Sequence, residues 1–457
     1  MLRQNAKKAS KIDTKGDIAL ASVIPQGAMK VLMVTCTYPH FSFNNEGTFV
    51  ANWAEQLKAA GLNIRVYKRD HLTFGSYLKS FSRVYEFYRH PRFYEYEYNG
   101  ISVFRQGMHL RLPLDYSKSA PKLTYKKMKP AIEKIYKQFP FHLVYLATWG
   151  DLSLSMSWIA KGMGIPYIAS AIGDHTNLYY NRPNSIYFKY HREIFLGSEF
   201  VICVSNDLNK KAKDMTEGKA KTFTFYSGVN IQRFKPSFKM RTVYRNRLGY
   251  FDTDFVILFV GRLTKSKGVY ELLEAFNFLV NHNRSVKLLL IGSLHERASL
   301  KKRIQSLGIN GSVLLTGGVG HNEIPGYMNA ADAFVLPSWM EGLPNVVMEA
   351  CACELPVVAS AVGGVPELIV HKKTGFLINP RSAADIAERL RFIITNSQVA
   401  ADVGKRARQE MVQKFNYHEN GRLLINKIQK IFEHRKSSVS KNTEPYRCKY
   451  LSNKITN

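Results

Sequence analysis

Residues 255–280 read FVILFVGRLTKSKGVYELLEAFNFLV, and this stretch decides the fold class. Residues 255–260 form an unbroken apolar run with β-branched members, which is typical of a strand buried on both faces. Residues 268–280 carry apolar side chains at helical spacing, so a helix is expected after a short loop. A strand, a loop and a helix in this order are the repeating unit of parallel α/β sheets.

The same unit recurs along most of the chain in two sets. Amphipathic segments between the strands imply right-handed crossovers and parallel sheets. The sequence therefore predicts an α/β protein with two Rossmann-like parallel-sheet domains that face a cleft. Strands are expected at 31–39, 63–69, 141–148, 166–173 and 200–205, then at 255–263, 286–292, 312–318, 333–338 and 356–364.

Composition divides the chain into five expected parts. Met29 opens the first strand and is a candidate for the true start of the protein. The parts are a disordered basic leader (1–28), a first domain (29–236), a second domain (237–414), a helix that packs back on the first domain (415–436) and a disordered tail (437–457).

Composition also favours some classes of function over others. The chain has 457 residues, of which 45% are hydrophobic and 22% charged, as in globular proteins. It shows no apolar run long enough to span a bilayer, and 1–28 lacks the apolar core of a signal peptide. Cys351 and Cys353 lie in an apolar stretch without metal-ligand spacing, so buried, reduced thiols and a cytosolic chain are expected.

The charge is strongly basic and unevenly placed. The net charge is +30, and about half of the excess lies in residues 29–236. This balance favours an anionic partner, either membrane headgroups or nucleic acid. Charge that serves only solubility would give the same balance, so this interpretation stays open beside the other two.

Residues 72–98 depart from the strand–helix rhythm because aromatic and basic residues alternate there. Such a stretch suits a membrane interface or a single-stranded nucleic acid. It is equally compatible with an insertion whose aromatic rings pack on the domain. The residues are Phe74, Tyr77, Lys79, Phe81, Arg83, Tyr85, Phe87, Tyr88, Arg89, Arg92, Phe93, Tyr94, Tyr96 and Tyr98.

The loop GRLTKSKG (261–268) is expected at the carboxyl edge of the second sheet, where α/β proteins bind ligands. Gly261 allows a close turn of the backbone, and Arg262 and Lys267 can converge on one anion. A guanidinium fork with an ammonium group suits a diphosphate. The spacing is not that of a Walker loop, and residues of these types are often simply solvated at a strand end.

A second stretch, PSWMEGLPNVVMEA (337–350), also follows an expected strand. Pro344 suits the first turn of a helix that starts at 343–344, which places Glu341 in the loop and Glu349 on the helix. The free N–H groups of Leu343 and Asn345 would favour an anion. The two acids could be a solvated face or a glycosidase pair, but a glycosidase does not need the Arg262 and Lys267 loop. Across the break they can instead bracket a nucleotide sugar, with Glu349 on the ribose.

These motifs together resemble the donor domain of the retaining glycosyltransferases of family 4, which have the GT-B fold. The resemblance rests on GRLTKSKG, EGLPNVVMEA and PVVASAVGGVPELI with KTGFLINP. SGVNIQRFKP (227–236) is similar to the linker of the family, and YPHFSFNNEGTFV (38–50) to its N-terminal glycine loop. The resemblance covers 29–435, is strongest at 227–380 and is patchy at 70–135. It points to enzymes of bacterial surface polysaccharides of the teichuronic acid type.

The resemblance implies a role for each matching residue. Arg262 and Lys267 would hold the diphosphate of the donor and stabilise it as a leaving group, Glu349 would bind the ribose, and Glu341 would contact the transferred sugar. Other nucleotide-sugar contacts would come from Gly47, Gly261, Val319, Gly342, Leu343 and Asn345.

On the acceptor-side first domain, the loop IGDHTN (172–177) supplies two alternative catalytic candidates, Asp174 and His175. Leu294 stands where the family commonly has a glycine, so part of the nucleotide pocket is expected to differ. Asp252 and Asp254 look like an Asp-x-Asp metal motif but precede a strand, so no metal is expected there. His321 is expected to be an ordinary loop residue.

The activity that the resemblance implies is that of a retaining, metal-independent hexosyltransferase without a cofactor. It would move a hexose or N-acetylhexosamine from a UDP- or GDP-sugar to a lipid-linked or polymeric glycan acceptor in surface glycan biosynthesis. The basic first domain implies a peripheral position on an anionic membrane at its cytoplasmic face. The alternatives are a GT-B protein that binds a nucleotide sugar or polyanion without transfer, and a nucleic-acid-binding protein, which rests on charge alone.

Overall fold

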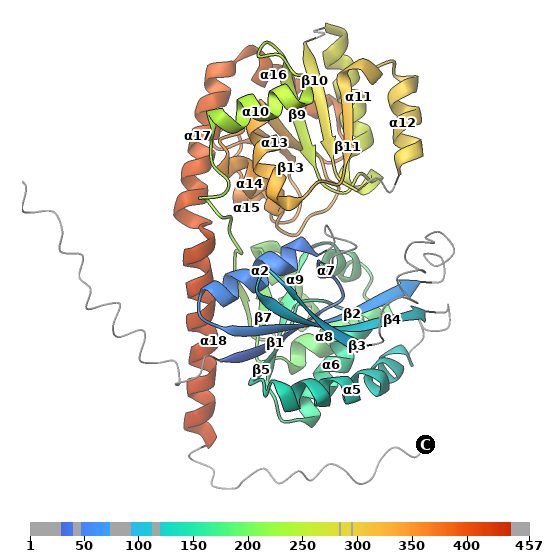
Figure 1. Ribbon diagram of the computed structural model, residues 1–457, viewed down its shortest axis with the longest axis vertical. Helices are drawn as coiled ribbons and strands as arrows, with labels where there is room; N and C mark the ends of the chain where they lie inside the picture. Colours follow the sequence, from blue (N-terminus) through green and yellow to red (C-terminus); the bar gives the residue numbers. More distant parts are fainter. Residues whose placement is uncertain are drawn as a thin grey trace, which may run out of the picture.

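The computed structural model describes residues 29–39, 47–73, 93–111, 119–282, 285–293 and 296–439. These residues form two sheets, each covered by helices, and Figure 1 shows the two layered bodies one above the other. The first sheet has the strand order β3-β4-β2-β1-β5-β6-β7-β8, and the second has the order β11-β10-β9-β12-β13-β14. Every strand pair is parallel except β3 with β4. The predicted α/β class with two Rossmann-like sheets is confirmed.

In the first sheet, β1 lies between β2 and β5, and its residues 31–34 are buried on both faces. This position explains the apolar run that predicted the strand. The strands are β1 (Lys30–Thr35), β2 (Asn63–Thr73), β3 (Phe93–Tyr98), β4 (Ile101–Arg111), β5 (Leu143–Leu146), β6 (Tyr167–Ala171), β7 (Val201–Cys203) and β8 (Thr222–Thr224). The helices are α2 (Thr48–Ala59), α5 (Ala120–Gln138), α6 (Asp151–Gly162), α7 (Gly173–Tyr180), α8 (Ile186–Gly197) and α9 (Asn206–Met215).

In the second sheet, β9 has β10 on one side and β12 on the other, so the run FVILFV is buried. The strands are β9 (Phe255–Val260), β10 (Val286–Ile291), β11 (Val313–Gly317), β12 (Ala333–Leu336), β13 (Val357–Ser360) and β14 (Phe376–Ile378). The helices are α10 (Phe238–Leu248), α11 (Val269–His282), α12 (Arg297–Ser306), α13 (Ile324–Ala330), α14 (Asn345–Ala352), α15 (Val365–Leu368), α16 (Ala383–Thr395) and α17 (Ser397–Lys414), with short 3-10 turns η2 (Lys265–Lys267), η3 (Asn310–Ser312) and η4 (His321–Glu323).

The antiparallel strand β3 was not anticipated. It pairs with β4 through the turn Asn99–Gly100, whose φ values of 48° and 72° are both positive, as a type I′ hairpin turn requires. Tyr96 is 9% exposed, and its hydroxyl donates to the Pro39 carbonyl over 2.7 Å. The aromatic residues at 93–98 therefore pack on the first domain. The rest of the aromatic and basic stretch, at 74–92, lies outside the described residues.

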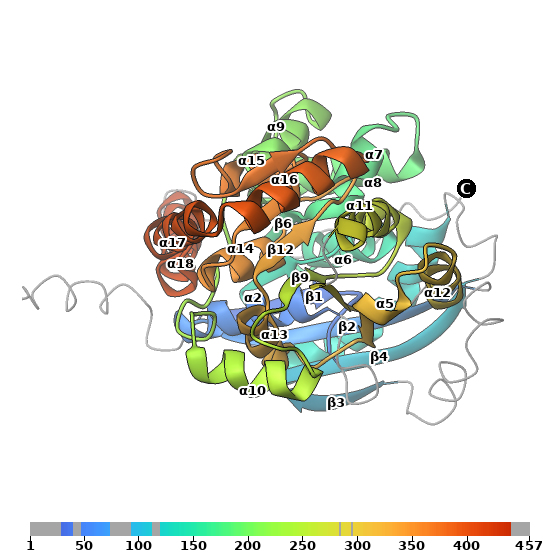
Figure 2. The same ribbon diagram turned by 90° about the horizontal axis from the view of Figure 1, so that it is seen from above.

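The chain crosses between the two domains twice, and the crossings touch. Val229 forms a bridge with Asn416, and the Val229 amide donates to the Phe415 carbonyl over 2.8 Å. The second crossing leads into α18 (Tyr417–Val439), whose buried side chains Leu424, Ile425 and Ile428 belong to the core of the first domain. Figures 1 and 2 show α17 and α18 nearly end to end along one side of the molecule.

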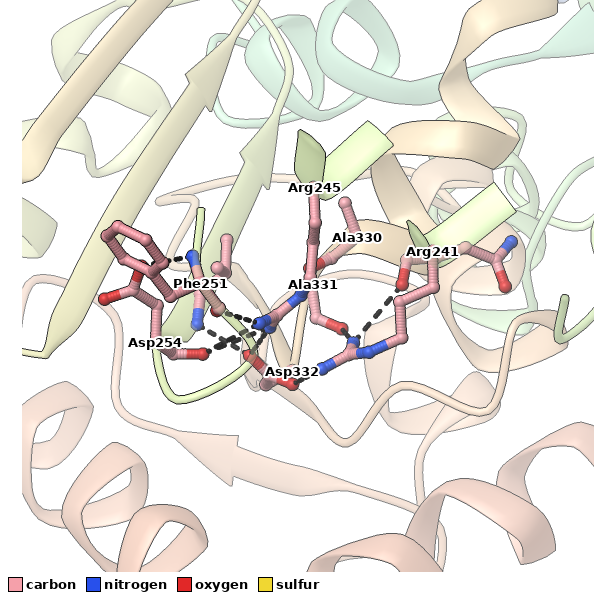
Figure 3. A network of polar contacts seen from close by, with 9 residues as sticks. Arg241, Arg245, Phe251, Asp254, Ala330, Ala331 and Asp332 are labelled. Carbon is pink, nitrogen blue, oxygen red and sulfur yellow. Dashed lines mark hydrogen bonds and ion pairs between the residues drawn. The ribbon is translucent and has the colours of Figure 1, made fainter. Parts of the chain in front are cut away.

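A buried polar network fixes α10 to the second sheet (Figure 3). The Arg245 guanidinium, in a residue only 1% exposed, donates to the carbonyls of Ala330, Phe251 and Asp254 and to Asp332 Oδ2 over 2.5 to 3.1 Å. Asp332 also accepts from the Val256 amide over 2.7 Å, which anchors the start of β9. The Asp254 carboxylate accepts from the Phe251 amide over 2.8 Å, so it closes a turn.

Candidate active site

Two loops of the second domain lie side by side at the carboxyl edge of its sheet. Residues 261–268 follow β9, residues 337–344 follow β12, and these strands are neighbours. The Trp339 amide donates to the Ser266 carbonyl over 2.9 Å. Lys267 Nζ donates to Glu341 Oε1 over 2.7 Å, and these side chains are 12% and 10% exposed. Two residues that the sequence predicted for one site therefore meet in a largely buried ion pair.

Gly268 allows these two loops to approach each other, and Gly292, after β10, allows a third loop to approach Gly261. Gly268 has φ +70°, and a Cβ there would lie 2.0 Å from the Pro337 carbonyl oxygen. Gly292 has φ +153°, and a Cβ there would lie 1.6 Å from the Gly261 carbonyl oxygen. A Cβ at Gly261 would instead meet the ring of Phe259 at 3.3 Å. The strongest requirement for glycine is at positions 268 and 292, and a side chain at Gly261 would need the Phe259 ring to shift slightly.

Arg262 lies in the same loop as Lys267, and α14 begins four residues after Glu341. The Arg262 side chain is exposed, so it can reach a ligand above the sheet edge. Pro344 has an extended conformation (φ −75°, ψ 111°), and α14 begins at Asn345, slightly later than predicted. Glu341 thus lies in the loop and Glu349 on the helix, as the sequence predicted.

Glu349 is 6% exposed and meets His321, the first residue of η4. The distance from His321 Nε2 to Glu349 Oε1 is 3.0 Å. The preceding loop contains Val319, which is partly buried against the core of the second domain. His321, which the sequence placed in an ordinary loop, thus contacts Glu349, the residue predicted to bind the ribose.

The first domain reaches this site through α7. The Asn177 amide side chain donates to the Glu341 carbonyl over 2.8 Å, and Lys211 Nζ donates to the Asn177 amide oxygen over 2.6 Å. A Cβ at Gly342 would lie 2.4 Å from the Gly173 Cα, so the backbones of the two domains touch. Asp174 and His175 lie on α7, but their side chains are outside the described residues. The sequence analysis did not single out Asn177.

A second contact between the domains uses Glu367 of α15. Its carboxylate accepts from the backbone amides of Asn206 and Asp207, at the start of α9, over 2.8 and 3.1 Å. It also accepts from the Tyr226 hydroxyl over 2.8 Å. Burial and the neighbouring Glu367 raise the pKa of Tyr226, so its hydroxyl stays a proton donor. Leu343 packs against the cores of both domains, so these contacts hold the two domains together beside the site.

A polar cavity of about 60 Å³ lies between α2, the linker and the second domain. Its lining includes Asn52, Arg233, His321, Asn345 and Glu349. Ligand pockets for molecules of nucleotide size are typically about 300 Å³ or more. The cavity is therefore smaller than a typical nucleotide pocket, and Arg262, Lys267 and Glu341 are not among the residues that line it.

The N-terminal glycine, Gly47, precedes α2 and has φ +79°. A Cβ there would lie 2.4 Å from the Thr37 carbonyl carbon, so glycine is required for packing against the end of β1. Residues 40–46 of its loop, and Leu294 of the second domain, lie outside the described residues.

Within the described ranges, no group of three or more His, Cys, Asp or Glu side chains is arranged to hold a metal ion. Asp252 and Asp254 therefore contribute to no such group there. A search of the same residues finds no helix that is both long and apolar enough to cross a membrane.

Comparison with known proteins identifies the family that the second domain matches and the fold of the whole molecule. Residues 240–410 match the family described as "Glycosyl transferases group 1". The fold resembles that of sucrose-phosphate synthase from Thermosynechococcus elongatus, with a TM-score of 0.70 at 20% identity over 89% of this chain and all of that one. It also resembles Anabaena HepE in complex with UDP-glucose, with a TM-score of 0.63 at 19% identity over 90% of this chain and all of that one.

The fold is therefore GT-B, and residues 240–410, which make up most of the second domain, match the group 1 glycosyl transferases. Among curated relatives it is 29% identical to TuaC of Bacillus subtilis, a glycosyltransferase named for teichuronic acid biosynthesis, over 79% of this chain and 88% of that protein. It is 31% identical to the capsular polysaccharide biosynthesis glycosyltransferase CapM of Staphylococcus aureus, over 47% of this chain and 57% of that protein.

Proposed function

We propose that this protein transfers a hexose or N-acetylhexosamine from a nucleoside-diphosphate sugar to an acceptor hydroxyl with retention of configuration. The observation that carries the proposal is the Lys267–Glu341 pair at the carboxyl edge of the second sheet, beside the start of α14. This edge is where α/β sheets bind ligands. A cation and a carboxylate side by side there suit a ligand that has an anionic diphosphate next to a hydroxyl-rich sugar.

Each residue then has a distinct role. Lys267 and the exposed Arg262 bind the diphosphate and stabilise its charge as it leaves. Glu341 accepts hydrogen bonds from the transferred sugar, and Glu349 accepts them from the ribose. The amides of Gly342, Leu343 and Asn345 add donors from the start of the helix.

The reaction follows as a displacement on one face of the sugar. The bond from the anomeric carbon to the diphosphate oxygen breaks, and a bond to the acceptor oxygen forms on the same face. The acceptor proton passes to the departing diphosphate, so no enzyme nucleophile is needed. Asp174 and His175 on α7 are the candidates for contact with the acceptor from the first domain.

The substrates are proposed from the relatives and from charge. The names of TuaC and CapM point to surface polysaccharides, and HepE was crystallised with UDP-glucose. A UDP- or GDP-sugar donor and a lipid-linked or polymeric glycan acceptor fit this setting. The basic first domain favours a peripheral position on the anionic cytoplasmic face of a membrane.

The first test is a thermal-shift screen of UDP-, GDP- and ADP-sugars, because a bound donor raises the melting temperature by mass action. The donor that binds is then tested for release of its nucleoside diphosphate with membrane extracts as a source of acceptor. Release that depends on Glu341 supports transfer. Binding without any release supports a non-catalytic GT-B protein, and no response to any donor would contradict the proposal.

A further inference from the structure

His321 occupies a position that the proposed reaction does not yet explain. It is the residue that contacts the carboxylate of Glu349, at 3.0 Å from Nε2 to Oε1. Both residues line the cavity between the domains, so the pair faces the space where a ligand would enter. The Glu349 side chain is 7% exposed and that of His321 is 23% exposed.

His321 is itself held from the linker between the domains. The guanidinium of Arg233 donates to the His321 carbonyl over 2.6 Å and to the Asn322 side-chain oxygen over 3.1 Å. The ring of Phe234, a residue 2% exposed, lies 5.9 Å from the His321 ring between centroids. The linker thus fixes the backbone and the ring plane of the histidine that meets Glu349.

The chemistry of a carboxylate explains why such a contact matters. A carboxylate has two oxygens with about four acceptor sites, and it can accept from two neighbouring hydroxyls. A donor from the protein on one oxygen fixes the plane of the group. The remaining acceptor sites are then directed at the ligand, in the same way that hydrogen-bond partners orient the side chains that bind metal ions.

We propose that His321 is a positioning residue that orients Glu349 toward the ribose hydroxyls and thereby makes the site select ribonucleotides over nucleotides without those hydroxyls. This inference rests on the proposed ribose role of Glu349. His321 acts through Glu349 and not by contact with the reacting atoms.

The experiment measures the affinity of UDP and GDP against their 2′,3′-dideoxy counterparts by calorimetry. The quantity of interest is the ratio of the two dissociation constants for the same base. In the unmodified protein this ratio should be about tenfold or more, as expected for hydrogen bonds to a charged group. His321→Ala should reduce the ratio severalfold, and His321→Gln, which keeps a side-chain N–H donor, should restore part of it.

Two further variants separate orientation from loop structure. Asn322→Ala removes the neighbouring contact with Arg233 but leaves the His321 side chain, and it should keep the ratio. Adding His321→Ala to Glu349→Ala should change the ratio no further. A normal ratio in His321→Ala, an equal loss in Asn322→Ala, or a further loss in the double variant would overturn the inference.

The same measurements show whether the ribose role of Glu349 or only the role of His321 is wrong. If Glu349→Ala keeps the ribose ratio of the unmodified protein, then Glu349 does not bind the ribose and both ideas fail together. If Glu349→Ala loses the ratio and His321→Ala keeps it, only the role of His321 is wrong.

Discussion

Lys267 and Glu341, 74 residues apart in the chain, form an ion pair of 2.7 Å at the edge of the second sheet. Buried ion pairs contribute little net stability, because desolvation offsets much of their attraction. A contribution to folding alone is therefore a weak explanation for the pair, and the proposed function gives it a second role. A diphosphate can take over Lys267 while Glu341 turns to the sugar, so the charges of the site are balanced before the donor arrives.

Gly268 should be essential for the position of Lys267. Gly268→Ala places a Cβ 2.0 Å from the Pro337 oxygen at φ +70°, so the two loops must separate. We expect destabilisation of about 2 kcal/mol or more and a strong loss of donor binding. Urea denaturation and calorimetry measure the two effects.

Gly308→Ala is the matched control, since Gly308 has φ +67° with open space around its Cβ position. The free energy of unfolding should fall by about 1 kcal/mol, because alanine is unfavourable at this positive φ, and donor binding should be unchanged. Equal effects at both positions would show that the contact with Pro337 is unimportant.

Glu367 should favour the arrangement in which the domains touch beside the site. Glu367→Ala removes three acceptor contacts at the start of α9 and at Tyr226. We expect a larger radius of gyration in X-ray scattering and about a tenfold lower turnover per donor bound, because charged hydrogen bonds contribute about 1.5–3 kcal/mol. Glu388→Ala, at an exposed position on α16, is the control. Scattering and turnover equal to the control would argue against this role.

The Arg245 network should dominate the stability of the second domain. Arg245→Met leaves the buried carbonyls of Ala330, Phe251 and Asp254 without this donor, and we expect a loss of about 3 kcal/mol in the free energy of unfolding. Arg247→Met, on the exposed face of the same helix, should leave the unfolding free energy unchanged. The prediction fails if chemical denaturation gives the same result for both variants.

The buried cysteines should resist alkylation. Burial raises the pKa of Cys203 and Cys351 to about 12. The thiolate forms only as the pH approaches that value, so on the order of one thiol in ten thousand is reactive at pH 8. Iodoacetamide labelling with peptide mass spectrometry should modify the partly exposed Cys36 before Cys203 and Cys351. Equal labelling rates in the native protein would contradict this expectation, and the unfolded protein provides the control in which all thiols react.

The sequence predicted the two sheets because buried parallel strands are apolar on both faces, as in 255–260 and 31–34. The strand β3 was not predicted, although Asn99–Gly100 is a strong hairpin signal. The composition of the aromatic and basic stretch around this turn suggested an interface or an insertion instead. The order of strands and loops also predicted that the loops of Lys267 and Glu341 share one edge of the sheet, and these two side chains meet there.

The contacts that complete the site could not be predicted in the same way. Asn177 meets Glu341 across 164 residues, and Glu367 meets Asn206 across 161 residues. These contacts depend on how two separately folded domains dock, and local pattern carries no information about that. The contact of His321 with Glu349 was not predicted, because a histidine in a loop has no periodicity that marks its partner.

The most direct test of the account is calorimetric binding of UDP and UMP, or of GDP and GMP, to Lys267→Ala and Lys265→Ala. Lys265 lies in the same 3-10 turn but is exposed. If Lys267 binds the diphosphate, Lys267→Ala should lose about tenfold or more of the affinity for the diphosphate and little for the monophosphate, while Lys265→Ala stays within about twofold of the unmodified protein. Unchanged diphosphate affinity in Lys267→Ala, or the same loss in Lys265→Ala, would contradict the account.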